Sequence, residues 1–177
     1  MFAQSGFGLA GGDLLVSSEN SGQIYRVDAT GDVNLWATVP LGVNQLGLRQ
    51  MAFAPAGFGA WGGDLFVSVS GSPRGGGTFG SVDVLNASGR LVAVLSQGTV
   101  GMPFDPRGLD FENSNTLLIN DGDPSILAAP PAAFTAATPE PGGVGIAGAG
   151  LLLLGLLRLR WDKRKERRAP KRDWLTS

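Results

Sequence analysis

Cysteine and histidine are both absent from the 177 residues. Without cysteine there can be no disulfide framework, thiolate metal site or cysteine nucleophile. Without histidine there is no imidazole to act as a metal ligand or as a general base near neutral pH. The remaining residues show no other catalytic constellation. We therefore expect a protein that is not an enzyme and that needs no cofactor.

Lysine is absent from the first 140 residues, which hold five arginines and twelve carboxylates, a formal net charge of −7. From residue 141 onward, nine basic residues outnumber three carboxylates, a formal net charge of +6. Such asymmetry indicates two environments and makes the basic end a candidate for a membrane surface. The acidic body repels phosphate, so we expect no nucleic-acid partner.

One long run without charge, GGVGIAGAGLLLLGLL, occupies residues 142–157. As a helix it would span about 24 Å, against a hydrocarbon core of about 30 Å. The alternative is a buried core segment, but each glycine in a soluble helix costs about 1 kcal/mol relative to alanine. Arg158 and Arg160 can extend their charges outward, and Trp161 suits the membrane interface. We expect one transmembrane helix over residues 142–160, with the lipid bilayer as a partner.

A basic cluster follows this run directly. Positive charge beside a membrane segment marks its cytoplasmic end. We therefore expect a single-pass inner-membrane protein with its body on the periplasmic or extracellular side and residues 169–177 as a cytoplasmic tail. The cluster consists of Arg158, Arg160, Lys163, Arg164, Lys165, Arg167 and Arg168.

A short motif, Pro139-Glu140-Pro141, stands immediately before the uncharged run, and a Pro/Ala-rich segment, residues 128–138, precedes it as an expected linker. The order of motif, apolar run and basic cluster over residues 139–168 resembles the PEP-CTERM sorting signal of Gram-negative bacteria that make extracellular polysaccharide. The resemblance implies that a membrane-embedded exosortase recognises the motif, cuts near it and releases the body to the cell surface or matrix. Such tails usually end soon after the arginines, whereas this chain continues to Ser177.

The body contains a glycine-rich repeat. Residues 6–17, GFGLAGGDLLVS, recur as residues 57–68, GFGAWGGDLFVS, with nine of twelve positions identical at a spacing of 51. A repeat of about 40–50 residues built from short strands is typical of propeller-like arrays. Asp13 and Asp64 occupy equivalent places and are expected to be structural turn residues.

Short apolar or alternating segments punctuated by turns predict four strands per repeat. The second repeat has candidates at residues 50–54, 64–69, 81–86 and 90–95, with a turn at 86–89. The first has candidates at 13–17, 23–27 and 33–37, with a turn at 28–32, and a third repeat begins at 107–111 and 115–120. The prediction is a mainly β fold over residues 1–127, a partial β-propeller-like array of antiparallel four-stranded blades.

This blade pattern resembles secreted propellers of the NHL and SMP-30 kind. About two and a half blades cannot close a ring, and neither a basic n-region nor an apolar h-region is found at Met1. We expect the sequence to represent the last blades of a longer protein whose N-terminal part carries the signal peptide. Neighbouring blades should bury a shared set of apolar residues: Leu14, Val16, Met51, Phe53, Leu65 and Val67.

Two pairs of acidic residues and one glycine-rich loop are further candidate sites in the sequence. Asp121 and Asp123 alternate as calcium ligands do, but the segment lacks the rest of a calcium loop, and a polar turn is the favoured interpretation. Asp110 and Glu112 could serve acid–base work on a sugar, or be a solvated pair. The glycine-rich residues 71–80 lack the ending of a phosphate-binding loop.

Two functions from different classes are therefore consistent with the sequence. The first is an exported cell-surface or matrix protein without catalysis, which binds partners such as extracellular polysaccharide. The second is a fragment of a secreted propeller hydrolase or lactonase with a metal ion in its channel. A ring of inward Glu, Asp or Asn residues from several blades would distinguish the second.

Overall fold

The structure, a computed structural model, describes residues 1–43, 45–71, 79–95, 105–120 and 126–137. Two units are distinguished, Met1–Ala137 and Thr138–Ser177, and the description below concerns the first. This unit is mainly β, with antiparallel strand pairs throughout, as the sequence predicts. The only helical segments among the described residues are three short 3-10 turns: η1 (Gly8–Ala10), η2 (Gly59–Trp61) and η3 (Pro131–Ala133).

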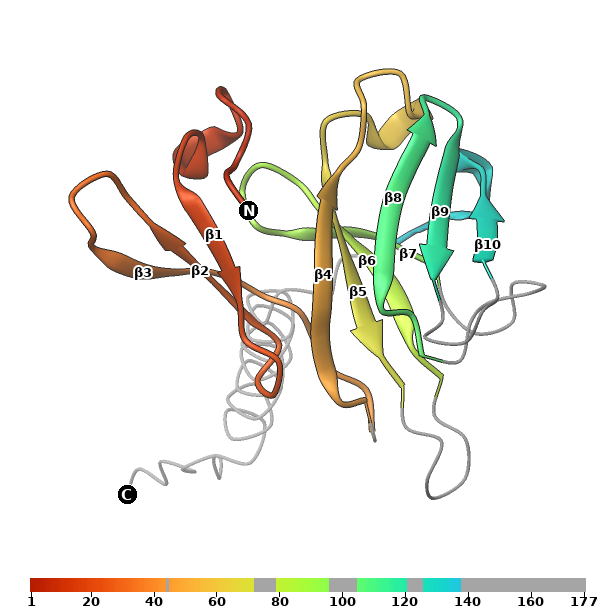
Figure 1. The fold of residues 1–177 in the computed structure, drawn as a ribbon, viewed down its shortest axis with the longest axis horizontal. Helices are drawn as coiled ribbons and strands as arrows, with labels where there is room; N and C mark the ends of the chain where they lie inside the picture. The colour runs from red at the N-terminus through yellow and green to blue at the C-terminus, as the bar shows by residue number, and fades with distance from the viewer. Residues whose placement is uncertain (44, 72–78, 96–104, 121–125, 138–177) are drawn as a thin grey trace, which may run out of the picture. The chain divides into compact units, whose positions relative to one another are not determined.

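The strands form three sheets that follow one another along the chain (Figure 1). The first sheet has the order β1 (Leu14–Ser17), β2 (Gln23–Val27), β3 (Val33–Thr38). The second has β4 (Gly47–Phe53), β5 (Leu65–Ser70), β6 (Ser81–Leu85) and β7 (Leu91–Leu95), and then β11 (Thr135–Ala136) beside β7. The third has β8 (Gly108–Asn113), β9 (Thr116–Asn120) and β10 (Ile126–Ala129).

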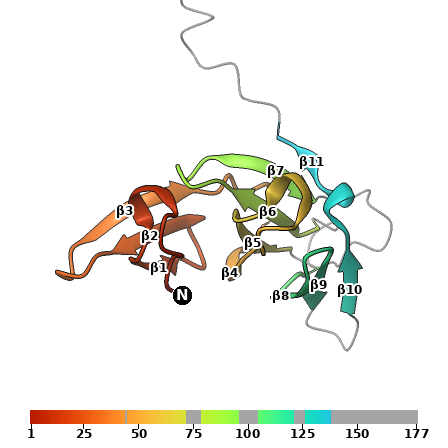
Figure 2. The ribbon, with the colours of Figure 1, turned by 90° about the horizontal axis from the view of Figure 1, so that it is seen from above.

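The sheets stack face to face and fan outward from the side on which β1, β4 and β8 lie (Figure 2). Contacts join β4 to both β1 and β8, so these three strands are the inner strands of the array. The second sheet has neighbours on both sides, and every residue of β5 and β6 is accordingly buried. None of the three described sheets has the four strands that the sequence predicts for a blade. The second sheet contains β4 to β7 in the predicted order, with β11 as a fifth strand, and the first and third sheets have three strands each.

The glycine-rich repeat folds the same way twice. Each copy makes a 3-10 turn, passes through two glycines and enters a strand, η1 to β1 in the first copy and η2 to β5 in the second. Gly8 and Gly59 both have φ of 53°, in the left-handed region that favours glycine. A Cβ on Gly8 would lie 2.3 Å from the carbonyl oxygen of Ala87, so this position also needs glycine for space. Matching backbone hydrogen bonds fix the two copies: Ala3 to Asp13 and Asp13 to Ala10 in one, Ala54 to Asp64 and Asp64 to Trp61 in the other.

The turn between β2 and β3 in the first sheet and the turn between β6 and β7 in the second are also equivalent. The carboxylate of Asp28 accepts hydrogen bonds from the backbone N–H groups of Thr30 and Asp32. The side-chain oxygen of Asn86 accepts the same pair from Ser88 and Arg90. This repeated local bonding explains why the turns at 28–32 and 86–89 were predictable from sequence alone.

Two apolar cores lie between the three sheets. The first joins the first sheet to the second through Leu15, Ile24, Leu65, Val67 and Leu85. The second joins the second sheet to the third through Phe66, Val84, Leu109, Leu117 and Ile119. The aromatic side chain of the repeat enters each core, Phe7 in the first and Phe58 in the second.

The predicted core is right for the second sheet and wrong for the first. Leu65 and Val67 are fully buried, and Met51 and Phe53 pack against them half-buried. Leu14 and Val16 instead lie on the outer face of β1, where Val16 is 44% exposed, and Leu15 takes the core position. The reason is that equivalent residues of the repeat point to equivalent faces, and the first sheet has no neighbour on that face among the described residues.

The segment expected as a linker, residues 128–138, is largely structured in its described part. Residues 128–129 end β10, η3 follows, and β11 pairs Thr135 with Val94 and Ala136 with Ala93. Phe134 is 7% exposed and contacts Phe58 and Phe66 with ring centroids 6.2 and 5.1 Å apart. Burial of this aromatic ring between the second and third sheets keeps the segment on the body.

Candidate functional site

Most of the residues singled out from the sequence lie outside the described residues. These are the sorting motif Pro139, Glu140 and Pro141, the basic cluster from Arg158 to Arg168, the expected helix at 142–160, and the acidic pair Asp121 and Asp123. In the part of the chain that the structure does describe, no helix is long and apolar enough to cross a membrane.

The two equivalent aspartates of the repeat have structural surroundings. Asp13 lies 3.4 Å from Nη1 of Arg26 on β2, which also donates to the carbonyl oxygen of Leu9. Burial raises the pKa of the Asp64 carboxyl above its usual value. Both residues sit where the chain leaves the glycine turn and enters a strand, as expected for turn residues.

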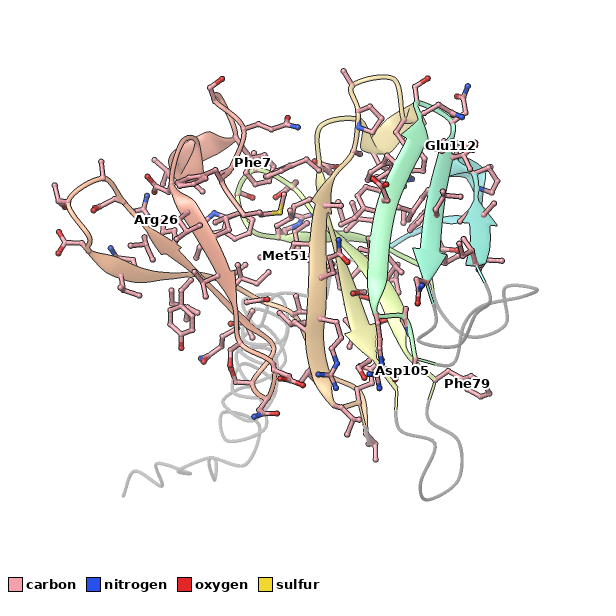
Figure 3. All side chains as sticks on the ribbon, viewed as in Figure 1. Phe7, Arg26, Met51, Phe79, Asp105 and Glu112 are labelled. Carbon is pink, nitrogen blue, oxygen red and sulfur yellow. The ribbon has the colours of Figure 1, made fainter. Side chains whose placement is uncertain are left out.

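Asp110 and Glu112 both lie on β8 and are exposed. Figure 3 places Glu112 at the end of β8 opposite to Asp105, away from the polar groups described below. The described residues contain no group of three or more Asp, Glu, His or Cys able to hold a metal ion.

The structure instead brings polar side chains together on the inner strands of the second and third sheets. Gln50 on β4 donates from Nε2 to the carbonyl oxygen of Leu109, at 3.0 Å, and its Oε1 accepts from the Leu109 N–H, at 3.2 Å. One amide side chain therefore satisfies both backbone groups of a residue on the neighbouring sheet. This joins β4 to β8 where no backbone ladder does.

Ser68 lies beneath this contact on β5, fully buried. Its hydroxyl accepts a hydrogen bond from the Gln50 N–H at 2.9 Å and lies 3.3 Å from the Gln50 carbonyl oxygen. The register of β4 against β5 shifts between Leu48 and Met51. The Ser68 hydroxyl therefore bonds the backbone groups of Gln50, which have no partner in the irregular ladder. Ser17 is its equivalent in the first copy of the repeat.

A second polar group lies at the start of β8. Ser70 donates to the carboxylate of Asp105 at 2.5 Å, and Nε of Arg107 donates to the other carboxylate oxygen at 2.7 Å. Asp105 thus links the end of β5 to the chain entering β8 (Figure 3). The bonds fix a loop between two sheets and leave the carboxylate occupied by partners.

Arg49 and Glu19 form an ion pair between β4 and the turn after β1. The Arg49 Nε is buried and has no hydrogen-bond partner among the described residues. Such a buried, unpaired donor costs free energy in the folded state. Arg49 also lines an open cavity of about 480 Å³ between β1 and β4, together with Met1, Leu14–Ser17, Gln50 and Met51.

Sequence reasoning missed Gln50, Ser68 and Asp105. The identity of Ser17 and Ser68 within the repeat was the available signal for one of them. Gln50 and Asp105 could not be found from the repeat or from local sequence, because the contacts that they make are long-range. No protein-family model matches the chain, and no curated protein matches it.

Proposed function

We propose that this chain is an exported cell-surface or matrix protein that is anchored and sorted by its C-terminal tail. The observation that carries the proposal is the order of three features in the sequence: Pro139-Glu140-Pro141, the uncharged run 142–157, and seven basic residues between 158 and 168. An exosortase is the processing partner of this tail, and the lipid bilayer holds it until it is cut. The helix at 142–160 has its basic end in the cytoplasm.

The body belongs, in this proposal, to a β-propeller of which this chain supplies consecutive blades. Three observations support it: the repeated module of turn and strand, the antiparallel order within each sheet, and the face-to-face stacking with β1, β4 and β8 innermost. The polar contacts found on the inner strands are satisfied within the protein and hold the sheets together. Groups that bond one another in this way are not free to act on a substrate, which favours display and binding over catalysis. Extracellular polysaccharide is the proposed partner class because the tail resembles the sorting signal of bacteria that make it.

Replacement of the sorting motif tests the proposal. The chain is expressed in a Gram-negative host that has an exosortase, with the same export signal fused ahead of Met1 in every variant. Changing Pro139, Glu140 and Pro141 to alanine should leave a full-length species in the membrane fraction, whereas the parent releases a shorter body. The matched control changes Pro170 and Lys171 to alanine, behind the basic cluster, and should be processed like the parent. Release of the same shorter body from the motif variant would refute the proposal.

A further inference from the structure

A second open cavity lies between the first sheet and the turn that joins β6 to β7. Its volume is about 470 Å³, within the range of about 300–1,000 Å³ that ligand sites commonly have. It is lined by η1, by Arg26 on β2, by Leu35 and Trp36 on β3, and by Ala87 and Ser88 of the turn. The cavity is therefore a product of the fold, because its walls come from separate parts of the chain.

An irregularity in β3 places Trp36 at this cavity. Tyr25 pairs with Leu35 and Ile24 pairs with Ala37, so Trp36 is the extra residue of a β-bulge. A bulge redirects the side chain that it carries, and bulges are over-represented beside functional sites. The corresponding irregularity between β6 and β7 carries no aromatic residue. The half-buried indole is therefore not part of the framework that the first two sheets share.

Two side chains of the cavity have N–H groups that the fold leaves free. Arg26 uses Nη1 for the carbonyl oxygen of Leu9 and the carboxylate of Asp13, and its Nε and Nη2 bond no described residue. The indole N–H of Trp36 likewise has no partner among the described residues. There, Arg49 Nε is the only buried side-chain nitrogen or oxygen without a partner, so the free N–H groups of Arg26 and Trp36 reach solvent.

The chemistry of the cavity matches an uncharged sugar ring. The Ser88 hydroxyl donates to Oδ1 of Asn86 at 2.7 Å, and its oxygen remains able to accept a hydrogen bond. Asp13 lies 3.4 Å from Arg26 and balances its charge, and the formal charge of −7 over residues 1–140 opposes an anionic ligand. A pyranose ring has hydroxyl groups around its rim, which donate and accept, and C–H groups on its faces, which pack on an aromatic ring.

We propose that this cavity binds a short segment of a neutral polysaccharide. A sugar face packs on Trp36, the free N–H groups of Trp36 and Arg26 donate to sugar hydroxyls, and Ser88 accepts from one. The inference rests on the proposed function, which names extracellular polysaccharide as the partner class, and gives that partner a site and a charge. Because the site belongs to the body, sugar binding and processing of the tail are measured separately.

The experiment follows the indole N–H signals of the tryptophans by NMR in the full chain, kept in a detergent without a sugar headgroup. The neutral probes are cellohexaose, maltohexaose and mannohexaose. A guluronate hexamer is the acidic probe, and tetraglycine blocked at both ends is the peptide control. The protein variants are Trp36→Phe, which keeps an aromatic ring and removes the N–H, and Ser88→Ala. Trp61→Phe, in the second copy of the glycine-rich module, is the matched control.

At least one neutral hexasaccharide should shift the Trp36 signal saturably at millimolar concentration, and added salt should leave its affinity unchanged. Trp36→Phe and Ser88→Ala should each weaken binding, measured by calorimetry, about fivefold or more, because each removes one hydrogen bond. Trp61→Phe should bind as the parent does. The other indole signals should keep their positions in Ser88→Ala, which shows that the loss of binding is not a loss of fold.

Three results would overturn the proposal. The first is no shift of the Trp36 signal with any neutral hexasaccharide. The second is a response to the guluronate hexamer alone that salt removes, which would show that Arg26 acts through its charge. The third is an equal shift with blocked tetraglycine, or undiminished binding by both variants. Failure of tail processing with sugar binding intact would contradict the proposed sorting and leave this site standing.

Discussion

Asp83 lies on β6 in the core between the first and second sheets, where only 4% of the residue is exposed. It faces the same side as Val67, its cross-strand partner, and no cation among the described residues pairs with it. Burial raises the pKa of its carboxyl from 3.8 to about 6, and a hydrogen bond from Ser81 opposes the shift. A carboxyl at this position therefore prefers to be neutral.

The pH dependence of stability follows from that preference. In the unfolded chain Asp83 ionises near pH 3.8, whereas in the folded chain it stays protonated to about pH 6. Ionisation between these values favours the unfolded state, so this group's contribution to the free energy of unfolding is full below pH 3.8 and is lost by about pH 6. The loss amounts to about 3 kcal/mol.

Asp83→Asn should remove the pH dependence of stability that this carboxyl causes. We expect the variant to be more stable than the parent at pH 7, by up to about 3 kcal/mol, with the difference shrinking toward pH 4. Urea denaturation of residues 1–137 across pH 4–7 measures it, and Asp110→Asn, at an exposed position on β8, is the control. A stability difference that does not change with pH would show that Asp83 is ionised in the folded body throughout.

At the level of elements, the glycine-rich module joins neighbouring sheets, a role that its sequence did not predict. Each copy carries an aromatic ring into the interface between its own sheet and the next. Phe7 meets Trp36 and Phe53 with ring centroids 5.6 and 4.7 Å apart, and Phe7 and Met51 both lie between β1 and β4 (Figure 3). The module thus places an aromatic side chain between two sheets, and its role is structural.

Loss of the Phe58 ring should lower the free energy of unfolding of residues 1–137. Phe58 is fully buried and packs edge-on against Phe66 and Phe111, with centroids 5.4 and 5.0 Å apart. Phe58→Ala should destabilise residues 1–137 by about 3–5 kcal/mol through lost burial and the cavity left behind. Leu9→Ala, in the first copy of the module but 85% exposed, should change stability by less than about 0.5 kcal/mol. Equal, small effects of both substitutions in chemical denaturation would contradict the role assigned to the ring.

The positions of strands and turns could be predicted because both depend on local sequence. The repeat fixed β1 and β5 together, and the Asp28 and Asn86 turns carry their own side-chain hydrogen bonds. Which face of β1 is buried could not be predicted, because period-two alternation marks two faces without saying which has a neighbour. Phe134 and the pairing of β11 with β7 were hidden for a similar reason, since a Pro/Ala-rich composition says nothing about one distant aromatic contact.

At the scale of the whole body, the outer face of the first sheet is apolar, and no other sheet among the described residues covers it. The register places Val16 opposite Tyr25 and Tyr25 opposite Leu35, so their side chains share that face, with Val33 beside them. Val33 and Leu35 are 63% and 54% exposed. A contiguous apolar face of this kind marks an interaction surface or an association hazard.

Residues 1–137, expressed without the tail, should therefore be only marginally stable and should self-associate as concentration rises. Val16→Lys combined with Leu35→Lys should shift the sedimentation profile toward monomer, because charge on this face opposes association. The control, Ala128→Lys on the exposed side of β10, should leave the sedimentation profile of residues 1–137 unchanged. A monodisperse parent monomer with a high melting temperature would mean that the body is complete without a neighbour on this face.

The proposed anchoring of the body on the outer side of the inner membrane can be measured directly, because the chain contains no cysteine. Two single-cysteine chains, Ser21→Cys in the body and Ser177→Cys at the end of the tail, are exported in the background where the sorting motif is changed to alanine, which retains the tail. A membrane-impermeant maleimide should label Ser21→Cys in cells whose outer membrane alone is opened. It should label Ser177→Cys only after the inner membrane is permeabilised. Ready labelling of Ser177→Cys before that step would contradict the proposed orientation of the tail.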